Sequence, residues 1–255
     1  MKVCIWCSKS EDIVNFNKIA HTIPQSLGGN HICKNVCDSC NEYFGNKEFG
    51  KPAIEITLKE VLNISKYLIL TQHKEINLKR FKSEYFVFDY KNSRRFFKFK
   101  MSYKLKLNFQ KEFGRRFRRG LFKVYLEERE RQIGDANHDR FNFIREFARF
   151  DLNDYPIFIQ KPRFKGIVYN TNDLLSQEIR FTEYSDEIDE KFRYYSYPLM
   201  GHNFVLPTSN QFMKERFNSY KDHLIKTNDA IGTELILVDN IENLDFRFQY
   251  MNEIK

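Results

Sequence analysis

The spacing of apolar residues predicts both helices and strands along this 255-residue chain. Apolar residues recur every three or four positions over Ala53–Leu70 (AIEITLKEVLNISKYLIL), which predicts an amphipathic helix. Alternation over Tyr85–Tyr90 and Arg95–Leu107 predicts strands with one buried and one basic face. Such a mixture predicts an α+β fold. Further helices are expected at Leu121–Phe150 and Asn210–Leu224, and further strands at Ile167–Tyr169, Phe204–Leu206 and Leu235–Val238.

The N-terminal segment has a shorter pattern of strand, turn, strand and helix. Phe16–Ile23 and Ile32–Val36 are the expected strands, and Gly28-Gly29-Asn30 is the expected turn between them. A helix is expected to begin at Ser39 and to include Phe44. A segment of this size cannot bury enough apolar surface to be stable alone, so a further source of stability is expected.

The five cysteines indicate what this source is, since all lie within the first 40 residues. Cys4-x-x-Cys7 and Cys37-x-x-Cys40 are two pairs of the kind whose thiolates face one ion, and two such pairs complete a tetrahedral zinc site. Cys33 is left over; it is expected to be a small buried side chain, with replacement of Cys37 as a ligand as the alternative. Structural Zn²⁺ would then supply much of the folding free energy.

Composition narrows the class of partner. The formal net charge of +8 fits a partner rich in phosphate, although a solvated basic surface would produce it equally well. No run of about 18 apolar residues is present, so no membrane-spanning helix is expected. The N-terminus lacks the long apolar core of a secretory signal, so a cytoplasmic location is expected, where clustered thiols bind metal more often than they form disulfides.

Together these residues resemble the HNH endonuclease family, in particular its zinc-stapled ββα-metal nucleases. The resemblance rests on the two cysteine pairs, on His21-x-Ile23-Pro24 with Gly28-Gly29, and on the run from Asn35 to Gly45. It covers about the first 50 residues and implies an HNH module over residues 1–58. Residues 59–255 would form a larger mixed α+β domain for DNA binding, regulation or oligomerisation, with a sub-boundary near residues 150–165.

The resemblance also implies roles for three polar residues. His21 matches the general base, and an imidazole suits this role because its ordinary pKa of about 6.5 leaves it mostly neutral near pH 7. Asn41 matches the helix residue that binds the single catalytic ion, Mg²⁺ or Mn²⁺. Asn35 matches the asparagine that braces the histidine loop, with Asn30 as the alternative.

Ala20 departs from the family pattern, which commonly has Asp, Glu or His before the base. Three interpretations remain open. Glu48 could supply the missing ligand, because it lies two helical turns after Asn41 and would share its face. Asn41 could hold the ion with only water and DNA phosphate. Otherwise the centre is inactive, and the protein binds DNA without cutting it.

Basic residues concentrate at residues 91–126, which contain 13 Lys or Arg and one acidic residue, Glu112. Basic side chains on such a segment could contact successive phosphates without reading sequence. A solvated basic face or an acidic protein partner are the alternatives. The residues predicted to contact nucleic acid are Lys98, Lys100, Arg115, Arg116, Arg118 and Arg119.

The sequence therefore favours a metal-dependent DNA endonuclease that serves in restriction or phage defence. One HNH centre cuts one strand, so a homodimer would be needed for a double-strand break. The alternatives are a non-catalytic zinc-stapled DNA-binding protein, and a nuclease subunit that a protein partner targets or triggers.

Overall fold

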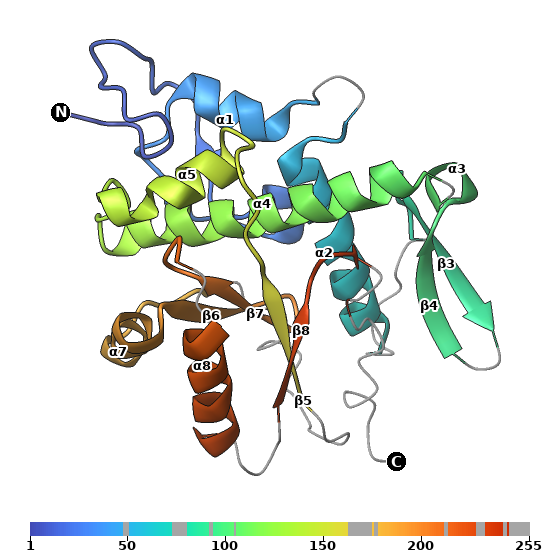
Figure 1. Ribbon diagram of the computed structural model, residues 1–255. Coiled ribbons are helices and arrows are strands. Elements are labelled where there is room, and N and C mark those ends of the chain that lie inside the picture. The colour runs from blue at the N-terminus through green and yellow to red at the C-terminus, as the bar shows by residue number, and fades with distance from the viewer. Residues whose placement is uncertain are drawn as a thin grey trace.

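The computed structural model describes residues 1–47, 51–72, 81–91, 94–104, 106–162, 175, 178–211, 214–227, 233–241 and 244. Its central element is the long helix α4 (Leu107–Gln132). Figure 1 shows α4 crossing the molecule between the N-terminal segment with α5 (Asn142–Ala148) and a β-sheet on the other side. Helices and strands are mixed within the chain, as the α+β prediction requires.

The N-terminal segment contains two short strands and one helix. β1 (Ala20–His21) pairs antiparallel with β2 (Ile32–Cys33), and each is shorter than the strand expected from the sequence. The one-turn helix η1 (Gln25–Leu27) lies between them, and α1 (Asp38–Gly45) follows. The order of strand, turn, strand and helix agrees with the sequence prediction.

Helix α2 (Ile54–Gln72) packs along α4 and confirms the helix predicted from apolar spacing. The contact is close at Gly120, where an added Cβ would lie 3.2 Å from Leu58 Cβ. The domain boundary expected at residue 58 falls inside α2, and one apolar core continues from Cys4 to Leu244. The N-terminal segment therefore shares its core with the rest of the described chain.

A hairpin extends from the N-terminal end of α4. β3 (Phe86–Lys91) pairs antiparallel with β4 (Arg94–Phe99), which confirms the strands predicted there. The predicted second strand continued to residue 107, and this part of the prediction is wrong. The short helix α3 (Met101–Lys104) begins instead, and α4 starts at Leu107 rather than at Leu121. The aromatic residues of this segment follow a four-residue spacing and pack together as a helical face, namely Phe109, Phe113 and Phe117.

The other side of α4 faces an antiparallel sheet of four strands in the order β6-β7-β5-β8. Tyr197 donates a hydrogen bond to the Leu121 carbonyl at 2.9 Å, which fixes the sheet to α4. The helix and strands predicted in the C-terminal part are confirmed at Asn210–Leu224, Phe204–Leu206 and Leu235–Val238 with shifted ends, whereas Ile167–Tyr169 lies outside the described residues. The remaining elements are η2 (Asp139–Phe141), β5 (Phe158–Pro162), α7 (Glu183–Phe192), β6 (Tyr194–Leu199), β7 (His202–Pro207), α8 (Lys214–Thr227) and β8 (Thr233–Leu237).

Helices α7 and α8 form a second apolar cluster with the sheet, which includes the stacked rings of Tyr194 and Tyr220.

Within the described part of the chain, no helix combines the length and the hydropathy that a bilayer span requires.

The paired glycines after η1 have two different functions in the turn. Gly28 caps η1 with a φ of 101°, a left-handed conformation that costs glycine little. Gly29 lies so close to the preceding chain that an added Cβ would be 2.0 Å from the Ile23 carbonyl oxygen. Gly28 therefore provides a conformation, and Gly29 provides space.

We expect Gly29→Ala to lower the free energy of unfolding by about 2 kcal/mol or more, because backbone atoms must move to admit the methyl group. Gly45→Ala is the matched control, since its Cβ would lie 3.8 Å from the nearest atom, a side-chain oxygen of Glu55. Chemical denaturation measures both variants. Equal stability of the two would contradict the close approach at Gly29.

Candidate active site and metal centre

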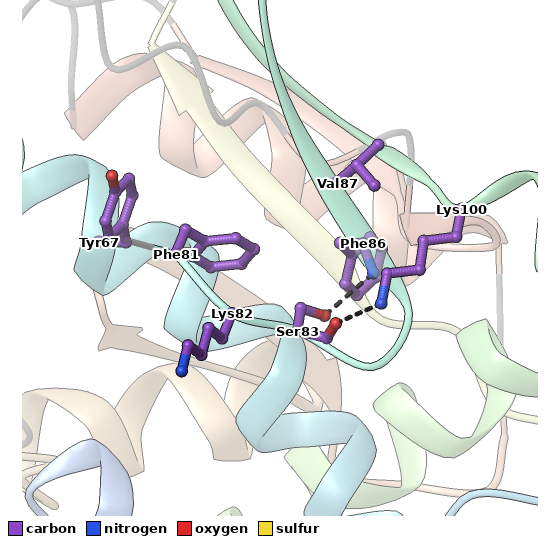
Figure 2. Close-up of a pocket in the computed structure, with 7 residues that line it drawn as sticks. All are labelled: Tyr67, Phe81, Lys82, Ser83, Phe86, Val87 and Lys100. Atoms are coloured by element: carbon purple, nitrogen blue, oxygen red, sulfur yellow. Dashed lines mark hydrogen bonds between the residues drawn. The ribbon is translucent and has the colours of Figure 1, made fainter. Parts of the chain in front are cut away.

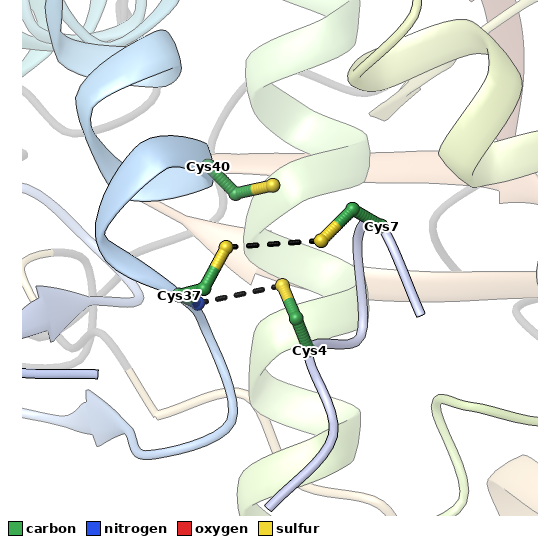
Figure 3. A group of neighbouring side chains, drawn as sticks. All are labelled: Cys4, Cys7, Cys37 and Cys40. Carbon is green, nitrogen blue, oxygen red and sulfur yellow. Dashed lines mark hydrogen bonds between the residues drawn. The ribbon is translucent and has the colours of Figure 1, made fainter. Parts of the chain in front are cut away.

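Four cysteines converge at the start of α1. The sulfur atoms of Cys4, Cys7, Cys37 and Cys40 all lie within 4.8 Å of one another (Figure 3). Cys4 and Cys7 come from the N-terminal loop, Cys37 is the N-cap residue of α1, and Cys40 lies in the first turn of α1. Among the described residues, this is the one group of three or more Cys, His, Asp or Glu that could hold a metal.

The spacing of these sulfurs fits a tetrahedral zinc ion. Four Zn–S bonds of about 2.3 Å separate the sulfurs of a tetrahedron by about 3.8 Å, and Cys7 Sγ lies 3.7 Å from Cys37 Sγ. A disulfide would require about 2.05 Å, and all five cysteines are free. The Cys37 amide also donates to Cys4 Sγ at 3.4 Å, so the loop is folded around the sulfur.

The thiols of the cluster interact with one another and with a nearby arginine. A hydrogen bond from the Cys40 thiol lowers the pKa of Cys4 to about 5, and the same bond raises the pKa of Cys40 well above its ordinary value. Arg149 Nε donates to Cys40 Sγ at 3.3 Å, which offsets part of the negative charge that four thiolates retain around Zn²⁺.

Cys33 lies outside this cluster. Its side chain is buried, with 2% of its surface exposed, and burial raises the pKa of its thiol far above the ordinary range. Cys37, rather than Cys33, therefore completes the group, as the spacing of the pairs predicted.

The cysteine cluster lies next to Asn41, the residue predicted to bind the catalytic ion. Asn41 directly follows Cys40 in α1, and its side-chain amide donates to the Ile19 carbonyl at 3.1 Å. Ile19 is two residues before His21, so this bond attaches α1 to β1 beside the predicted base. The amide nitrogen of Asn41 is thereby oriented toward the strand, and the amide oxygen is the atom that suits a hard cation.

His21 lies in β1, and both its backbone and its ring are informative. Its carbonyl accepts a hydrogen bond from Lys123 Nζ at 3.0 Å. Its ring atom Nδ1 is buried and has no hydrogen-bond partner among the described residues. A buried ring nitrogen without a partner is costly unless a ligand or solvent molecule satisfies it, so it marks this ring as a functional candidate. Ala20, the preceding residue, is 1% exposed and belongs to the apolar core.

Asn35 connects three parts of the molecule. Its carbonyl accepts from the Ile5 amide at 2.9 Å, and its side chain donates to Glu130 Oε1 of α4 at 2.6 Å. It thus ties the cysteine loop to α4, whereas Asn30, the alternative, is exposed. Glu48, the predicted second ligand of the catalytic ion, lies outside the described residues.

Residues 4–50 match the family model of the HNH endonuclease, and the match includes all four clustered cysteines, His21, Asn35 and Asn41. This segment is thus similar to HNH endonucleases, and it is called the HNH module below. No curated protein and no solved structure matches the chain.

The HNH module is held against α4 by buried polar contacts that sequence reasoning missed. Lys123 is 1% exposed and pairs with Glu127 at 2.8 Å and with Glu55 of α2 at 3.0 Å, while it also donates to His21. Burial raises the pKa of the Glu127 carboxyl to about 7, against the lowering effect of Lys123. The Trp6 indole donates to the same carboxylate at 3.1 Å.

The next acid of α4 contacts the residues that flank β1 and β2 of the HNH module. Glu128 is fully buried, and its Oε1 accepts from Thr22 Oγ1 at 2.5 Å and lies 3.4 Å from His31 Nδ1. Thr22 is adjacent to His21, and His31 precedes β2. In the sequence these acids belong to the run EERE, which begins at Glu127, but nothing near them in the sequence indicates that their charges are buried.

The predicted arginine contacts to DNA phosphate are not supported by the positions of these side chains. Arg116, Arg118 and Arg119 are at most 7% exposed. Arg116 donates to Glu112 at 2.7 Å, and Arg118 donates to Asp154 at 2.8 Å. Arg119 donates to the Ala148 carbonyl at 3.2 Å, and Arg115 donates to Asp151 at 3.0 Å. These arginines therefore pair within the fold, because other elements cover α4 on all sides over residues 116–129.

The two lysines predicted to contact nucleic acid lie outside α4, unlike the four arginines. Lys98 and Lys100 are half-buried at the end of β4. Lys100 Nζ donates to the Ser83 carbonyl at 2.7 Å, beside the cavity that Figure 2 draws.

We expect Cys40→Ser to reduce bound zinc and to destabilise the HNH module, because it removes one of four thiolates from the cluster. Cys33→Ala is the matched control and should retain about one zinc per chain, since Cys33 is buried outside the cluster. Elemental analysis of the purified variants, together with thermal denaturation, measures both effects. Loss of zinc from Cys33→Ala alone would reverse the assignment.

We expect Arg119→Ala to lower the free energy of unfolding by on the order of 2 kcal/mol, because Asp151 and the Ala148 carbonyl lose a buried donor. Lys111→Ala, an exposed position on the same helix, should change it by less than about 0.5 kcal/mol. DNA affinity, measured well below the unfolding temperature, should differ little between the two variants. A specific loss of DNA affinity in Arg119→Ala, without loss of stability, would instead support the predicted contact of Arg119 with DNA phosphate.

Proposed function

We propose that this protein is a metal-dependent DNA endonuclease that hydrolyses phosphodiester bonds. The observation that carries the proposal is the hydrogen bond from Asn41 to the carbonyl of Ile19, which is two residues before His21. Both residues lie inside a segment that matches HNH endonucleases. The sequence alone supported each of these roles by resemblance. The hydrogen bond from Asn41 to the Ile19 carbonyl supports the proposal, because it attaches α1 to the residue that precedes β1.

His21 would act as the general base. Its ring takes a proton from a water molecule as the water oxygen attacks the phosphorus, and the bond from phosphorus to the 3′ oxygen breaks. The products are a 5′-phosphate and a 3′-hydroxyl. The bond from Lys123 to the His21 carbonyl fixes the strand from which the ring projects. A rigid strand suits a base that must be within hydrogen-bond distance of the water.

Asn41 and Glu48 would hold a catalytic Mg²⁺ or Mn²⁺, with Zn²⁺ confined to the four cysteines. A divalent ion at this position would offset the charge that develops on the phosphate and the leaving oxygen. Asn41 fits this role through its amide oxygen. Glu48 is proposed only because it follows Asn41 closely in the sequence, since α1 ends at Gly45 and the shared helical face that was expected for the two residues does not form.

The net charge of +8 supports a nucleic acid as the partner. Restriction or phage defence is the biological role that we propose, with a homodimer for double-strand cleavage or a protein partner that directs the nuclease.

A second candidate is a non-catalytic zinc-stapled DNA-binding protein. The observation that favours it is Ala20, whose small side chain lies in the apolar core where related nucleases commonly carry a metal ligand. A cleavage assay separates the two functions.

We expect the zinc-loaded protein to nick or cut plasmid DNA with Mg²⁺ or Mn²⁺, and His21→Ala to reduce the rate by about 100-fold or more, the usual contribution of a general base. His138→Ala is the control, because His138 is an exposed residue that caps η2 outside the HNH module. Parallel assays with RNA define the substrate. Equal cleavage by His21→Ala would remove His21 as the base, and DNA that is bound but intact under every metal would favour the second candidate.

A further inference from the structure

A cavity lies at the junction of α2 with the β3–β4 hairpin, remote in sequence from His21. It has a volume of about 550 Å³ and is lined by Tyr67, Phe81, Lys82, Ser83, Phe86, Val87 and Lys100 (Figure 2). Cavities of about 300–1,000 Å³ commonly hold small organic ligands. Its walls combine three aromatic rings with two ammonium groups, so they offer both stacking surfaces and positive charge.

The aromatic part of this cavity is held rigidly. Phe86 packs on Phe99 at 4.7 Å and on Phe113 of α4 at 5.6 Å between ring centroids, so the floor is fixed to the central helix. Phe81 and Tyr67 form an edge-to-face pair at 5.2 Å. Figure 2 shows the Phe81 ring extending toward Phe86. A preformed aromatic wall lowers the entropic cost of binding a flat ring.

The cationic part is also positioned by the backbone. Lys100 Nζ donates to the Ser83 carbonyl at 2.7 Å, which uses one of its three donors. Ser83 is fixed in turn, since its hydroxyl accepts from the Phe86 amide at 3.0 Å and donates to Glu60. Lys82 is exposed at the rim. An ammonium group held at the edge of an aromatic cavity recognises an anion attached to a flat ring.

We propose that this cavity binds a nucleotide, with the base against Phe81 and the phosphate at Lys100. Stacking of bases on aromatic side chains and pairing of phosphate with lysine are the two interactions by which proteins bind unpaired nucleotides. The choice of a nucleotide among anionic aromatic ligands rests on the proposed nuclease function. The nucleotide could be free or part of a single strand, and the two sources share this chemistry.

Binding to full-length, zinc-loaded His21→Ala without a catalytic metal tests the proposal separately from cleavage. The probes are a nucleoside 5′-monophosphate, the nucleoside alone, inorganic phosphate, a short single-stranded oligonucleotide and the same sequence as a duplex, each followed by calorimetry. We expect the monophosphate or the single strand to bind at least about tenfold more tightly than nucleoside or phosphate, because both parts contribute. Tighter binding of the strand than of the monophosphate identifies a strand as the source, and the reverse identifies a free nucleotide.

Three variants in the same background locate the site. Lys100→Met should weaken binding about tenfold or more through loss of the charge, and Phe81→Leu should weaken it several-fold through loss of the ring. Lys104→Met is the matched control, since Lys104 is an exposed lysine of α3 outside the cavity, and should bind within about twofold of the parent. Thermal denaturation checks that each variant is folded. Absence of binding by every probe, equal binding of phosphate alone, or binding unchanged in both folded cavity variants would overturn the proposal, whether or not the protein cleaves DNA.

Discussion

The buried contacts between the HNH module and the C-terminal half of α4 are the constraint on which the arrangement of the site depends. An ammonium group and two carboxylates, from Lys123, Glu127 and Glu128, lie where almost no solvent reaches. Burial of charges costs free energy unless each charge has its partners in place. The strand carbonyl of His21 and the hydroxyl of Thr22 are among these partners. The strand that carries His21 therefore has one favourable position relative to α4, because displacement would leave charges without partners.

The four-cysteine cluster and α4 hold the HNH module from two sides. The four cysteines fix the N-terminal loop to the start of α1, which sets Asn41 against β1. The polar residues of α4 fix the two strands and the indole of Trp6. Arg149, which follows α5, contacts Cys40 and so links α5 to the cysteine cluster. The candidate site thus lies between the four-cysteine cluster on one side and a set of ion pairs and hydrogen bonds from α4 on the other.

Local signals in the sequence predicted the cysteine cluster and α2. The buried positions of the charged residues of α4 were not predicted, because they depend on contacts between residues far apart in the sequence. Two Cys-x-x-Cys pairs carry their geometry within four residues each, so their convergence could be expected. The apolar spacing of α2 was equally local. The arginines around Phe117 had no such signal, because the groups that bury them, such as Asp154, are about 36 residues away.

The same limit applies to the acidic residues of α4. The hydrogen bond from Thr22 to Glu128 joins positions 106 residues apart, and a charged stretch in a helix normally indicates a solvated face. Asn35 illustrates the partial success of family resemblance. The resemblance implied that Asn35 braces the loop of His21, whereas the contacts of Asn35 are with Glu130 of α4 and with the Ile5 amide.

The dependence of the HNH module on α4 has a consequence for how such a chain could evolve. Small nuclease modules are suited to exchange between proteins, because a compact metal-stapled unit can carry its chemistry with it. Here a transplanted module would bring along Trp6, Thr22 and Asn35, whose polar atoms are satisfied by acids of the host helix. A new host would need matching acids at the same helical spacing, or new apolar neighbours in their place. Module and helix would therefore be inherited together, and changes on one side of their interface should be accompanied by changes on the other.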